Sequence, residues 1–421
     1  MSHTENTDRL VDHLFRHEAG RIVSTLTRIF GIDRMEIAED VVQEALLKAL
    51  QQWPYSGVPE NPAGWIMQVA RRQALDILRR EQNLKSKEVE ILADIGPQTT
   101  DQNELFLDDD IRDDELRMMF VCCHPSLGVE SQIALTLKTL CGFGVDEIAR
   151  AFLCSRETIH KRLVRARQHL REGVARFEIP ANNTNRLETV LQVLYLLFNE
   201  GYNASHGEEL IRRDLGEEAI RLTRLLAQHR VGNDPKTHAL LALMLLHTAR
   251  FPGRVDNGGN LLLLREQDRS VWNKAMILEG LQELDHSAIG DEISEYHLQA
   301  GIAACHCLAE SYESTDWKRI LMLYDMLVEI NDSPVVSLNR AIAVSKVSGA
   351  EAGIQTIQEI RNRKQLDRYY LLYAVLGEFQ MTLGNFEEAA KSYRKALELT
   401  QLKSEQVFLM GKLEAVSQNV N

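Results

Sequence analysis

The fold of this protein is decided by residues 145–170, VDEIARAFLCSRETIHKRLVRARQHL. The segment predicts two helices that meet at a tight turn. The first helix repeats its apolar residues at the spacing of one buried face: Val145, Ile148, Ala149 and Phe152. Ser155 is a candidate N-cap for the second helix, because its hydroxyl can accept a backbone N–H that the first turn leaves unpaired. The second helix repeats its apolar residues in the same way: Ile159, Leu163, Ala166 and Leu170.

The second helix is strongly basic on its other face. Between Ser155 and Arg176, seven basic residues stand against two acidic ones, a local charge of +5 in a protein of net charge −13. A short helix docked on a basic second helix is the helix–turn–helix pattern, in which the second helix enters the major groove of DNA. The alternative is an ordinary helix pair with a solvated basic face.

Composition limits the remaining interpretations. A chain of 421 residues predicts two or three domains, and the acidic total confines any nucleic-acid binding to basic patches. The first 20 residues lack the apolar core of a signal peptide. The longest apolar runs, such as 240–246, are far shorter than the ~18 residues of a membrane span. With six cysteines and no such signals, we expect a cytoplasmic protein with reduced thiols.

The N-terminal part also predicts helices, over residues 8–80. Residues 35–50 form one amphipathic helix, and residues 51–62, with three prolines and a glycine, predict a loop. Residues 65–80 predict a helix with a local charge of +3. Trp53, Tyr55 and Trp65 flank the loop beside these arginines, where aromatic rings suit stacking on unpaired bases. Packing in a small helical core is the commoner fate of each ring.

Residues 101–115 predict an acidic linker. Eight acids are opposed only by Arg112, a run that is most often solvated and mobile. It could also act as a decoy for the neighbouring basic helices. Two cysteine–histidine clusters, 122–124 and 305–307, have poor chelate spacing and lack a CxxC partner. We therefore expect buried thiols, with no metal and no cofactor.

Beyond Pro180 the pattern is helical throughout and ends in a repeat. Eight residues fall at the positions of a tetratricopeptide (TPR) unit, with small residues where two helices cross closely: Tyr373, Leu376, Gly377, Gly384, Phe386, Ala389, Tyr393 and Ala396. A degenerate copy surrounds Trp317. One repeat cannot stand alone, so we expect at least three.

Three separated motifs together resemble one family. They are residues 38–50 (AEDVVQEALLKAL), 61–80 (NPAGWIMQVARRQALDILRR) and the helix–turn–helix from Asp146 to Leu170. In this order they resemble an extracytoplasmic-function (ECF) sigma factor of bacterial RNA polymerase, over roughly residues 8–175. Residues 181–421 resemble the C-terminal extension of a subfamily that ends in a TPR-like domain. The stretches NEGY (199–202) and EQDRSVWN (266–273) belong to this second resemblance, although loop and cap chemistry would also explain them.

The resemblance implies site residues in each motif. The first motif binds the clamp helices of the polymerase core, which here implicates Asp40, Gln43, Glu44 and Leu47. The second motif and its loop read and melt the −10 promoter element, through Asn61, Trp65, Arg71, Arg72 and Arg79. The helix–turn–helix would read the −35 element, through Ser155, Arg156, Glu157, Thr158, His160 and Lys161. Arg162 and Arg165 are expected to grip phosphates.

Two positions depart from the family pattern. Leu153 and Glu157 stand where many members carry glycine, which leaves the turn geometry open at Leu153. The carboxylate of Glu157 could accept a hydrogen bond from cytosine N4 or cap the helix, and we favour capping.

The resemblance also implies an all-α protein of five segments. These are region 2 (8–82), an acidic linker (83–116), region 4 (117–178), a helical extension domain (182–290) and TPR-like repeats (291–415). The expected partners are bacterial RNA polymerase core, promoter DNA and a protein or peptide ligand of the repeats, with no membrane. We expect the extension to regulate the sigma domains, and no residue to be catalytic.

Two rival interpretations stay open. A polymerase-independent helix–turn–helix regulator with a TPR domain would leave the loop and the 35–50 helix unexplained. An enzyme in the C-terminal half, using Glu200, Glu266 or Asp268 as acid and base, lacks any supporting motif.

Overall fold

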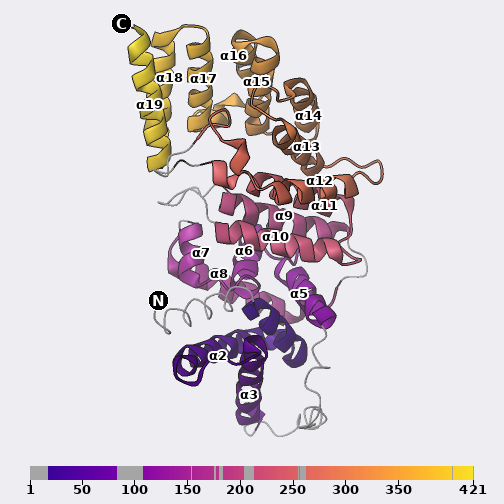
Figure 1. Ribbon diagram of the computed structural model, residues 1–421. Helices are drawn as coiled ribbons and strands as arrows, with labels where there is room; N and C mark the ends of the chain where they lie inside the picture. The colour runs from indigo at the N-terminus through magenta and orange to yellow at the C-terminus, as the bar shows by residue number, and fades with distance from the viewer. Residues whose placement is uncertain are drawn as a thin grey trace. The chain divides into compact units, whose positions relative to one another are not determined.

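The computed structural model describes residues 18–82, 108–152, 154–174, 177–179, 184–202, 213–254, 256, 262–400 and 402–420. The chain folds into two compact units, Met1–Leu196 and Leu197–Asn421 (Figure 1). The prediction of an all-α protein is confirmed, since the described residues form helices and include no strand. Across these ranges, no helix is long and apolar enough to cross a membrane.

The first unit begins with three helices around a small core. Residues 18–30 are helical, the short turn η1 spans Ile32–Arg34, and α2 (Met35–Ser56) packs on α3 (Pro62–Gln82). The buried faces carry large apolar residues at helical spacing, among them Leu26, Leu46, Ile66 and Leu78. The loop between α2 and α3 is thereby held against a rigid base.

Helix α2 is longer than predicted. The loop expected over residues 51–62 begins only at Gly57, because α2 continues through Pro54 to Ser56. Trp53 lies in the core at 2% exposure and packs edge-on against Trp65, with ring centroids 5.4 Å apart. Burial of this ring holds the last turn helical although Pro54 lacks a backbone N–H. The helix stops at Gly57, whose φ of 82° favours glycine.

The second part of the first unit contains the helix–turn–helix. Helices α5 (Asp108–Cys122), α6 (Val129–Thr139), α7 (Val145–Ala151) and α8 (Arg156–His169) are followed by the π-helical turn η2 (Leu170–Val174). Both α6 and α7 pack on α8. The predicted apolar face of α8 is confirmed as buried: Ile159, Leu163, Ala166 and Leu170. The Ser155 hydroxyl caps α8 as predicted, because its Oγ accepts from the Thr158 N–H at 3.1 Å. Leu153 lies outside the described residues.

The expectation of a solvated, mobile acidic run over residues 101–115 is wrong from Asp108 onward. Within the predicted 83–116 linker, residues 108–116 are already part of α5. Asp114 is fully buried: its Oδ2 lies 2.9 Å from Arg28 Nε, and its Oδ1 lies 2.7 Å from Arg117 Nη1. Burial raises the pKa of Asp114, although both arginines oppose the shift. The two arginine partners stabilise the buried carboxylate, whereas the acids of a solvated run are stabilised by water. Residues 101–107 lie outside the described ranges.

The cysteine clusters contain buried thiols, as predicted. Cys122, Cys123 and Cys307 are buried, while Cys305 is half-buried. Burial raises the pKa of Cys123 to about 12, with the Thr136 hydroxyl opposing the shift. Such a thiol is protonated at neutral pH and chemically inert.

Helix α9 (Thr184–Tyr202) leads from the first unit into the second. The second unit is built around α11 (Pro235–Thr248), which packs on α10 (Arg213–Gln228), α12 (Lys274–His286) and α13 (Glu295–Leu308). Residues 239–246 of α11 are all buried, as expected of a helix that is apolar on every side. The short turns η3 (Phe251–Gly253) and η4 (Arg269–Val271) lie between α11 and α12 in the chain.

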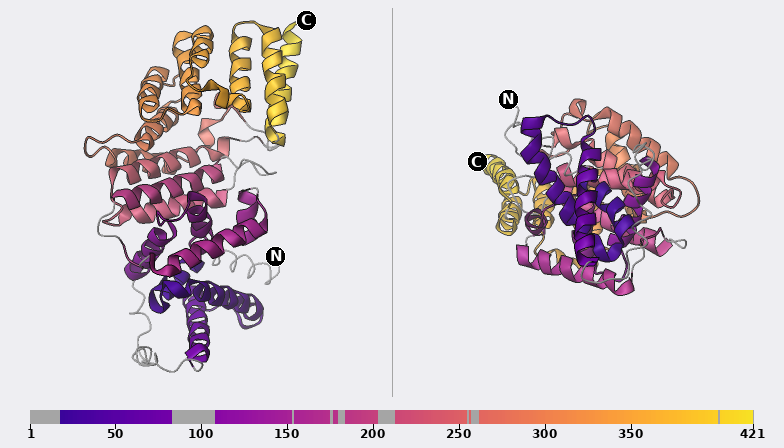
Figure 2. Two further views of the ribbon diagram at one scale, coloured as in Figure 1. Left: turned by 180° about the vertical axis from the view of Figure 1, so that it is seen from behind. Right: turned by 90° about the horizontal axis from the view of Figure 1, so that it is seen from below.

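The rest of the second unit is a row of helices. They are α14 (Trp317–Ile330), α15 (Pro334–Ser348), α16 (Ala350–Gln358), the turn η5 (Arg363–Leu366), α17 (Tyr370–Thr382), α18 (Phe386–Leu399) and α19 (Lys403–Val420). Each α-helix from α13 onward packs on the one that precedes it. Figures 1 and 2 show them side by side in chain order.

The hairpin of α17 and α18 has the close crossing that the sequence pattern requires. A Cβ added at Gly377 would lie 2.6 Å from Cε1 of Tyr393, so no larger residue fits there. Ala389, Tyr393 and Ala396 are buried on the facing side of α18. The assignment of this hairpin to the TPR class, and the number of repeats, stay predictions.

Candidate nucleic-acid and polymerase interfaces

The N-terminal half of α8 presents most of the residues predicted to read the −35 element. The exposed side chains are Ser155, Arg156, Glu157, Thr158, His160, Lys161 and Arg165. Arg162 is half-buried and forms an ion pair with Glu130. Since the Ser155 cap fixes the first turn, these side chains project from the free end of a rigid helix.

Two ion pairs on this surface are weak enough to be exchanged for phosphates. Arg156 lies 3.5 Å from Asp146, and Lys161 lies 2.7 Å from Glu157, with all four side chains at least 60% exposed. Exposed pairs contribute about 0–1 kcal/mol. Glu157 was favoured as a cap of α8. The capping hydrogen bond comes instead from Ser155, and the Glu157 carboxylate forms an ion pair with Lys161 one turn further along the helix.

The residues predicted to contact the −10 element fall into two groups. Asn61 Oδ1 accepts from the Gly64 N–H at 2.9 Å, so this side chain holds the start of α3. Trp65 is half-buried against Trp53. The three arginines lie further along α3, with Arg71 half-buried and both Arg72 and Arg79 exposed. The first group therefore shapes the loop, and the second offers positive charge.

Tyr55 is an exposed aromatic residue beside this loop. Its side chain is 92% exposed at the last turn of α2, whereas Trp53, two residues earlier, is in the core. The sequence marked both rings as flanking the loop, but the predicted −10 residues did not include Tyr55. Which ring is buried depended on how far α2 continues.

The predicted polymerase-binding residues share one face of α2. Asp40, Glu44 and Leu47 are exposed and Gln43 is half-buried, as their spacing on a helix requires. Leu47 is 56% exposed. The Glu44 carboxylate accepts a hydrogen bond from Gln73, which ties this face to α3.

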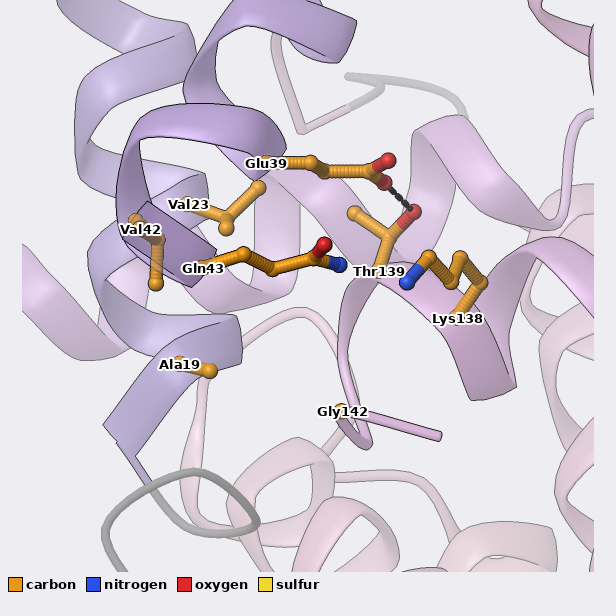
Figure 3. A pocket seen from close by; sticks show the side chains of 8 residues that line it. All are labelled: Ala19, Val23, Glu39, Val42, Gln43, Lys138, Thr139 and Gly142. Atoms are coloured by element: carbon orange, nitrogen blue, oxygen red, sulfur yellow. Dashed lines mark hydrogen bonds between the residues drawn. The ribbon is translucent and has the colours of Figure 1, made fainter. Parts of the chain in front are cut away.

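A seam of charged residues joins α2 to the helix–turn–helix part of the unit. We define it by Glu36 and Glu39 on α2, Arg167 on α8 and Arg171 on η2. Glu39 is 6% exposed. One carboxylate oxygen accepts from Thr139 Oγ1 at 2.6 Å and the other is paired with Arg167 (Figure 3). At the rim, Arg171 Nη2 lies 3.0 Å from Glu36 Oε2.

The backbones also approach closely beside the seam. A Cβ added at Gly20, in the helix 18–30, would lie 2.1 Å from the carbonyl oxygen of Leu140. A small pocket next to this contact is lined from both sides, by Ala19, Val23, Glu39, Val42, Gln43, Lys138, Thr139 and Gly142 (Figure 3). Burial raises the pKa of Asp40, which borders the seam, while the Arg167 charge opposes the shift.

The seam was not predicted. Glu39 lies among the apolar positions of α2 and has no nearby partner in the sequence. Arg167 entered only the local charge of the basic helix and was not among the residues predicted to contact DNA. The two are 128 residues apart in the chain. The one signal in the sequence was an acidic residue at a helix position that faces the core, because a buried carboxylate needs a cation beside it.

Two of the three carboxylates considered for catalysis, Glu266 and Asp268, hold backbone turns. Glu266 Oε2 accepts from the Leu263 N–H at 2.8 Å, and Asp268 Oδ1 accepts from the Ser270 N–H at 2.8 Å. In the same stretch, Asn273 caps α12, and Arg269 donates to the carbonyl oxygens of His306 and Ala309 at 2.6 Å. Residues 266–273 therefore act through loop and cap chemistry.

Comparison with known families shows a sigma factor, with α2 and α3 in one matched region and the α7–α8 helix–turn–helix in the other. The family described as Sigma-70 region 2 matches residues 14–84, and Sigma-70, region 4 matches residues 117–170. A family of unknown function, DUF6596, matches residues 186–288. The chain belongs to the sigma-70 family, as an ECF-type sigma factor with a C-terminal extension.

One relative is similar over most of the length of both chains. "Uncharacterized protein R00370" of Rhizobium meliloti (strain 1021) is 37% identical over 387 residues, which cover 90% of each chain. Regions 2 and 4 support a role in promoter recognition and imply binding to RNA polymerase core and promoter DNA. They indicate a non-enzymatic transcription factor.

Proposed function

We propose that the three exposed surfaces of the first unit divide the work of initiation. The α2 face of Asp40, Gln43, Glu44 and Leu47 binds the polymerase core. The loop at residues 57–61, with Tyr55, Trp65 and the arginines of α3, reads and melts the −10 element. The N-terminal turns of α8 read the −35 element. The observation that carries the proposal is the capped first turn of α8, where the side chains expected to read bases are exposed.

Charge supports the division of roles within α8. Arg162 and Arg165 lie beyond the first turn, where phosphate contact is expected, and Ser155 to Lys161 occupy the end that reaches base edges. While the seam is closed, Arg167 is paired with Glu39 and is not available for DNA contact.

The seam must open when both promoter elements are bound. Elements at −10 and −35 lie about 25 base pairs apart, roughly 85 Å of B-form DNA at ~3.4 Å per base pair. Helices of 14 and 21 residues, as α8 and α3 are, extend only about 21 and 32 Å. Two domains in contact through Glu39 and Arg167 cannot place these helices 85 Å apart. Asp40, next to Glu39, belongs to the polymerase face, so core binding can drive the separation.

The C-terminal extension is proposed to regulate the sigma domains from within the same chain. We assign a helical extension domain to residues 182–290 and TPR-like repeats, with a protein or peptide ligand, to residues 291–415. Covalent attachment and the compactness of the second unit support this proposal. Region 2 (8–82) and region 4 (117–178) complete the proposed domains.

Transcription in vitro with purified bacterial core polymerase tests the function directly. We expect the full chain to direct initiation from specific genomic fragments and to bind single-stranded −10 DNA only together with core. A polymerase-independent regulator would instead bind duplex sites without core and would direct no initiation. That second outcome would overturn the proposal in favour of the rival interpretation.

The substitution Gly20→Ala is expected to open the seam. The new methyl group meets the Leu140 backbone, and overpacking costs roughly 1–3 kcal/mol. That cost shifts the closed–open equilibrium about 5- to 150-fold. The backbone amides of α2, α6 and α8 beside the seam should then exchange hydrogen faster in the free protein while core-dependent initiation is retained, as measured by mass spectrometry and run-off transcription.

The matched control is Gly128→Ala, which adds the same methyl group where nothing lies within 4 Å. It should change neither measurement. Loss of initiation in a Gly20→Ala protein that keeps its helical content would show that the closed arrangement is the active one.

A further inference from the structure

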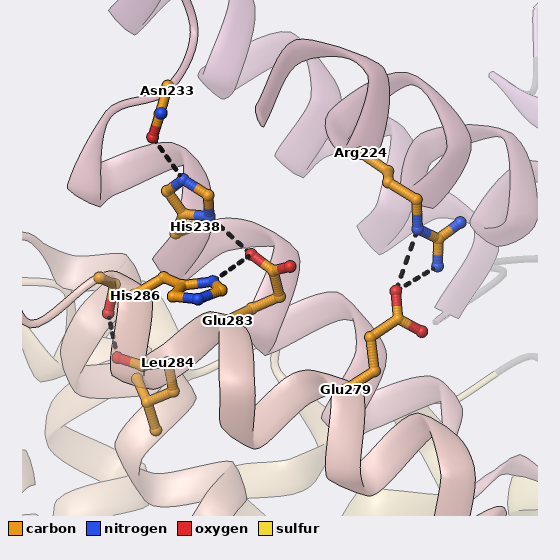
Figure 4. A network of polar contacts seen from close by, with 8 residues as sticks. Arg224, Asn233, His238, Glu279, Glu283, Leu284 and His286 are labelled. Carbon is orange, nitrogen blue, oxygen red and sulfur yellow. Dashed lines mark hydrogen bonds and ion pairs between the residues drawn. The ribbon is translucent and has the colours of Figure 1, made fainter. Parts of the chain in front are cut away.

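Three potential metal ligands meet on the second unit. His238 lies on α11, and Glu283 and His286 lie on α12 (Figure 4). The carboxylate of Glu283 is 2.6 Å from His238 Nδ1 and 3.9 Å from His286 Nδ1. One ligand atom from each residue lies within 4.8 Å of the other two. His238 and Glu283 are largely buried, and His286 is exposed.

The surroundings of His238 call for a cation. Its Nε2 lies 2.9 Å from Asn233 Oδ1, while its Nδ1 faces the Glu283 carboxylate. A neutral imidazole has one N–H and one lone pair, so with Nε2–H donated to Asn233 the Nδ1 lone pair would point at a negatively charged oxygen. A metal ion between Nδ1 and the carboxylate removes this repulsion; the other tautomer, with the Asn233 amide turned to donate to Nε2, is the metal-free alternative.

We propose that His238, Glu283 and His286 bind a divalent transition metal ion of the zinc class. Two histidines and one glutamate are a common ligand set for zinc, with the fourth position left to water. The Asn233 contact has the role of an outer-shell partner, because it fixes the tautomer that leaves Nδ1 free for the metal. The inference does not depend on the sigma function, since it concerns the second unit alone.

The spacing of the three residues suits this ion. Ligand atoms about 2.0–2.1 Å from a tetrahedral zinc are roughly 3.3 Å from one another. The separations of 2.6 and 3.9 Å lie on either side of that value, and the exposed His286 side chain is free to adjust. Glu283 and His286 are three residues apart on α12 and therefore share one face of the helix.

The electrostatics of the neighbouring side chains leave Glu283 available. The next carboxylate along α12, Glu279, is already held by Arg224 at 2.8 and 3.0 Å (Figure 4). The bound ion would join α11, the central helix of the unit, to the end of α12.

The test is calorimetric titration of the full chain with Zn²⁺ after dialysis against a chelator. We expect one site per chain and a rise in the thermal unfolding temperature of the second unit. Mg²⁺, which prefers six oxygen ligands, should give none of these. The variants His238→Ala and Glu283→Gln should lose more than the roughly 10- to 100-fold in affinity that outer-shell changes cost.

Two further variants separate a specific site from adventitious binding. Asn233→Ala should weaken Zn²⁺ binding about tenfold, and Glu279→Gln, one turn away, should leave it unchanged. Because Glu283→Gln preserves the size of the side chain, its helical content should match that of the native chain. Zn²⁺ binding that is absent, or that survives in both His238→Ala and Glu283→Gln, would overturn the proposal and leave His238 as a metal-free hydrogen-bond partner of Glu283.

Discussion

Replacement of Glu39 by alanine is expected to destabilise the first unit by about 3 kcal/mol. The substitution leaves Arg167, 11% exposed, without its main partner in the seam. Breaking a buried ion pair from one side costs about 3–5 kcal/mol, because the remaining charge is uncompensated. The lower end applies here, since Arg167 keeps Glu36 at 3.8 Å. Hydrogen exchange resolved by mass spectrometry should show the loss in α2, α6 and α8 and not in the second unit.

The matched control for this prediction is Glu36→Ala at the rim of the same seam. Glu36 is 42% exposed, so its ion pairs should contribute less than about 1 kcal/mol. The double variant Glu39→Met with Arg167→Met should recover most of the loss, because it removes both charges at similar volume. Equal effects of the two single alanine variants would contradict a buried role for Glu39.

The double variant Arg162→Ala with Arg165→Ala is expected to weaken promoter binding by the holoenzyme roughly 60-fold at 0.1 M salt. Each lost phosphate contact removes about 0.9 from the slope of log affinity against log salt concentration, so the slope should fall by about 2. Filter binding or anisotropy over a range of salt concentrations measures both quantities. The ratio between specific and non-specific affinity should change little, since phosphates carry no sequence information.

Arg167→Ala is the control on the same helix. It removes an identical charge two residues from Arg165, but one that is directed to Glu39 in the seam. In the free protein its effect should appear in the stability of the first unit, because the closed seam loses its buried ion pair. A salt slope of holoenzyme binding that falls as much as in the double variant would show that Arg167 reaches DNA once the seam opens, and that the assignment of phosphate contact to Arg162 and Arg165 alone is wrong.

Local pattern was sufficient for the elements whose stability is local. The alternation of apolar residues predicted α7, α8 and most of α3, and the Ser155 cap was predicted from one hydroxyl next to a periodic run. These features succeed because the helix period and the capping hydrogen bond involve neighbours within four residues. The repeat pattern also marked Gly377 as a position where two helices cross closely, and it lies against Tyr393 in the α17–α18 hairpin.

Pattern failed where a distant residue decides the outcome. Residues 51–56 carry a proline and polar side chains, yet they stay helical because Trp53 is buried against Trp65. The acidic residues of α5 predicted a mobile segment. Asp114 is nevertheless buried, because Arg28, 86 residues away in the chain, forms an ion pair with it. In both cases a long-range contact outweighs the local preference of the chain.

The sequence by itself thus predicted the helical parts and their order, because these follow from short-range periodicity, and it indicated the class of the protein through the resemblance of three motifs to ECF sigma factors. Only the tertiary structure decided which charges are free. Arg165 and Arg167 look alike in the sequence, but one is exposed and the other is paired with Glu39. Likewise, His238 and Glu283 lie 45 residues apart in the chain and become neighbours only when α11 packs on α12. The availability of a charge or a ligand depends on partners that folding brings from far along the chain.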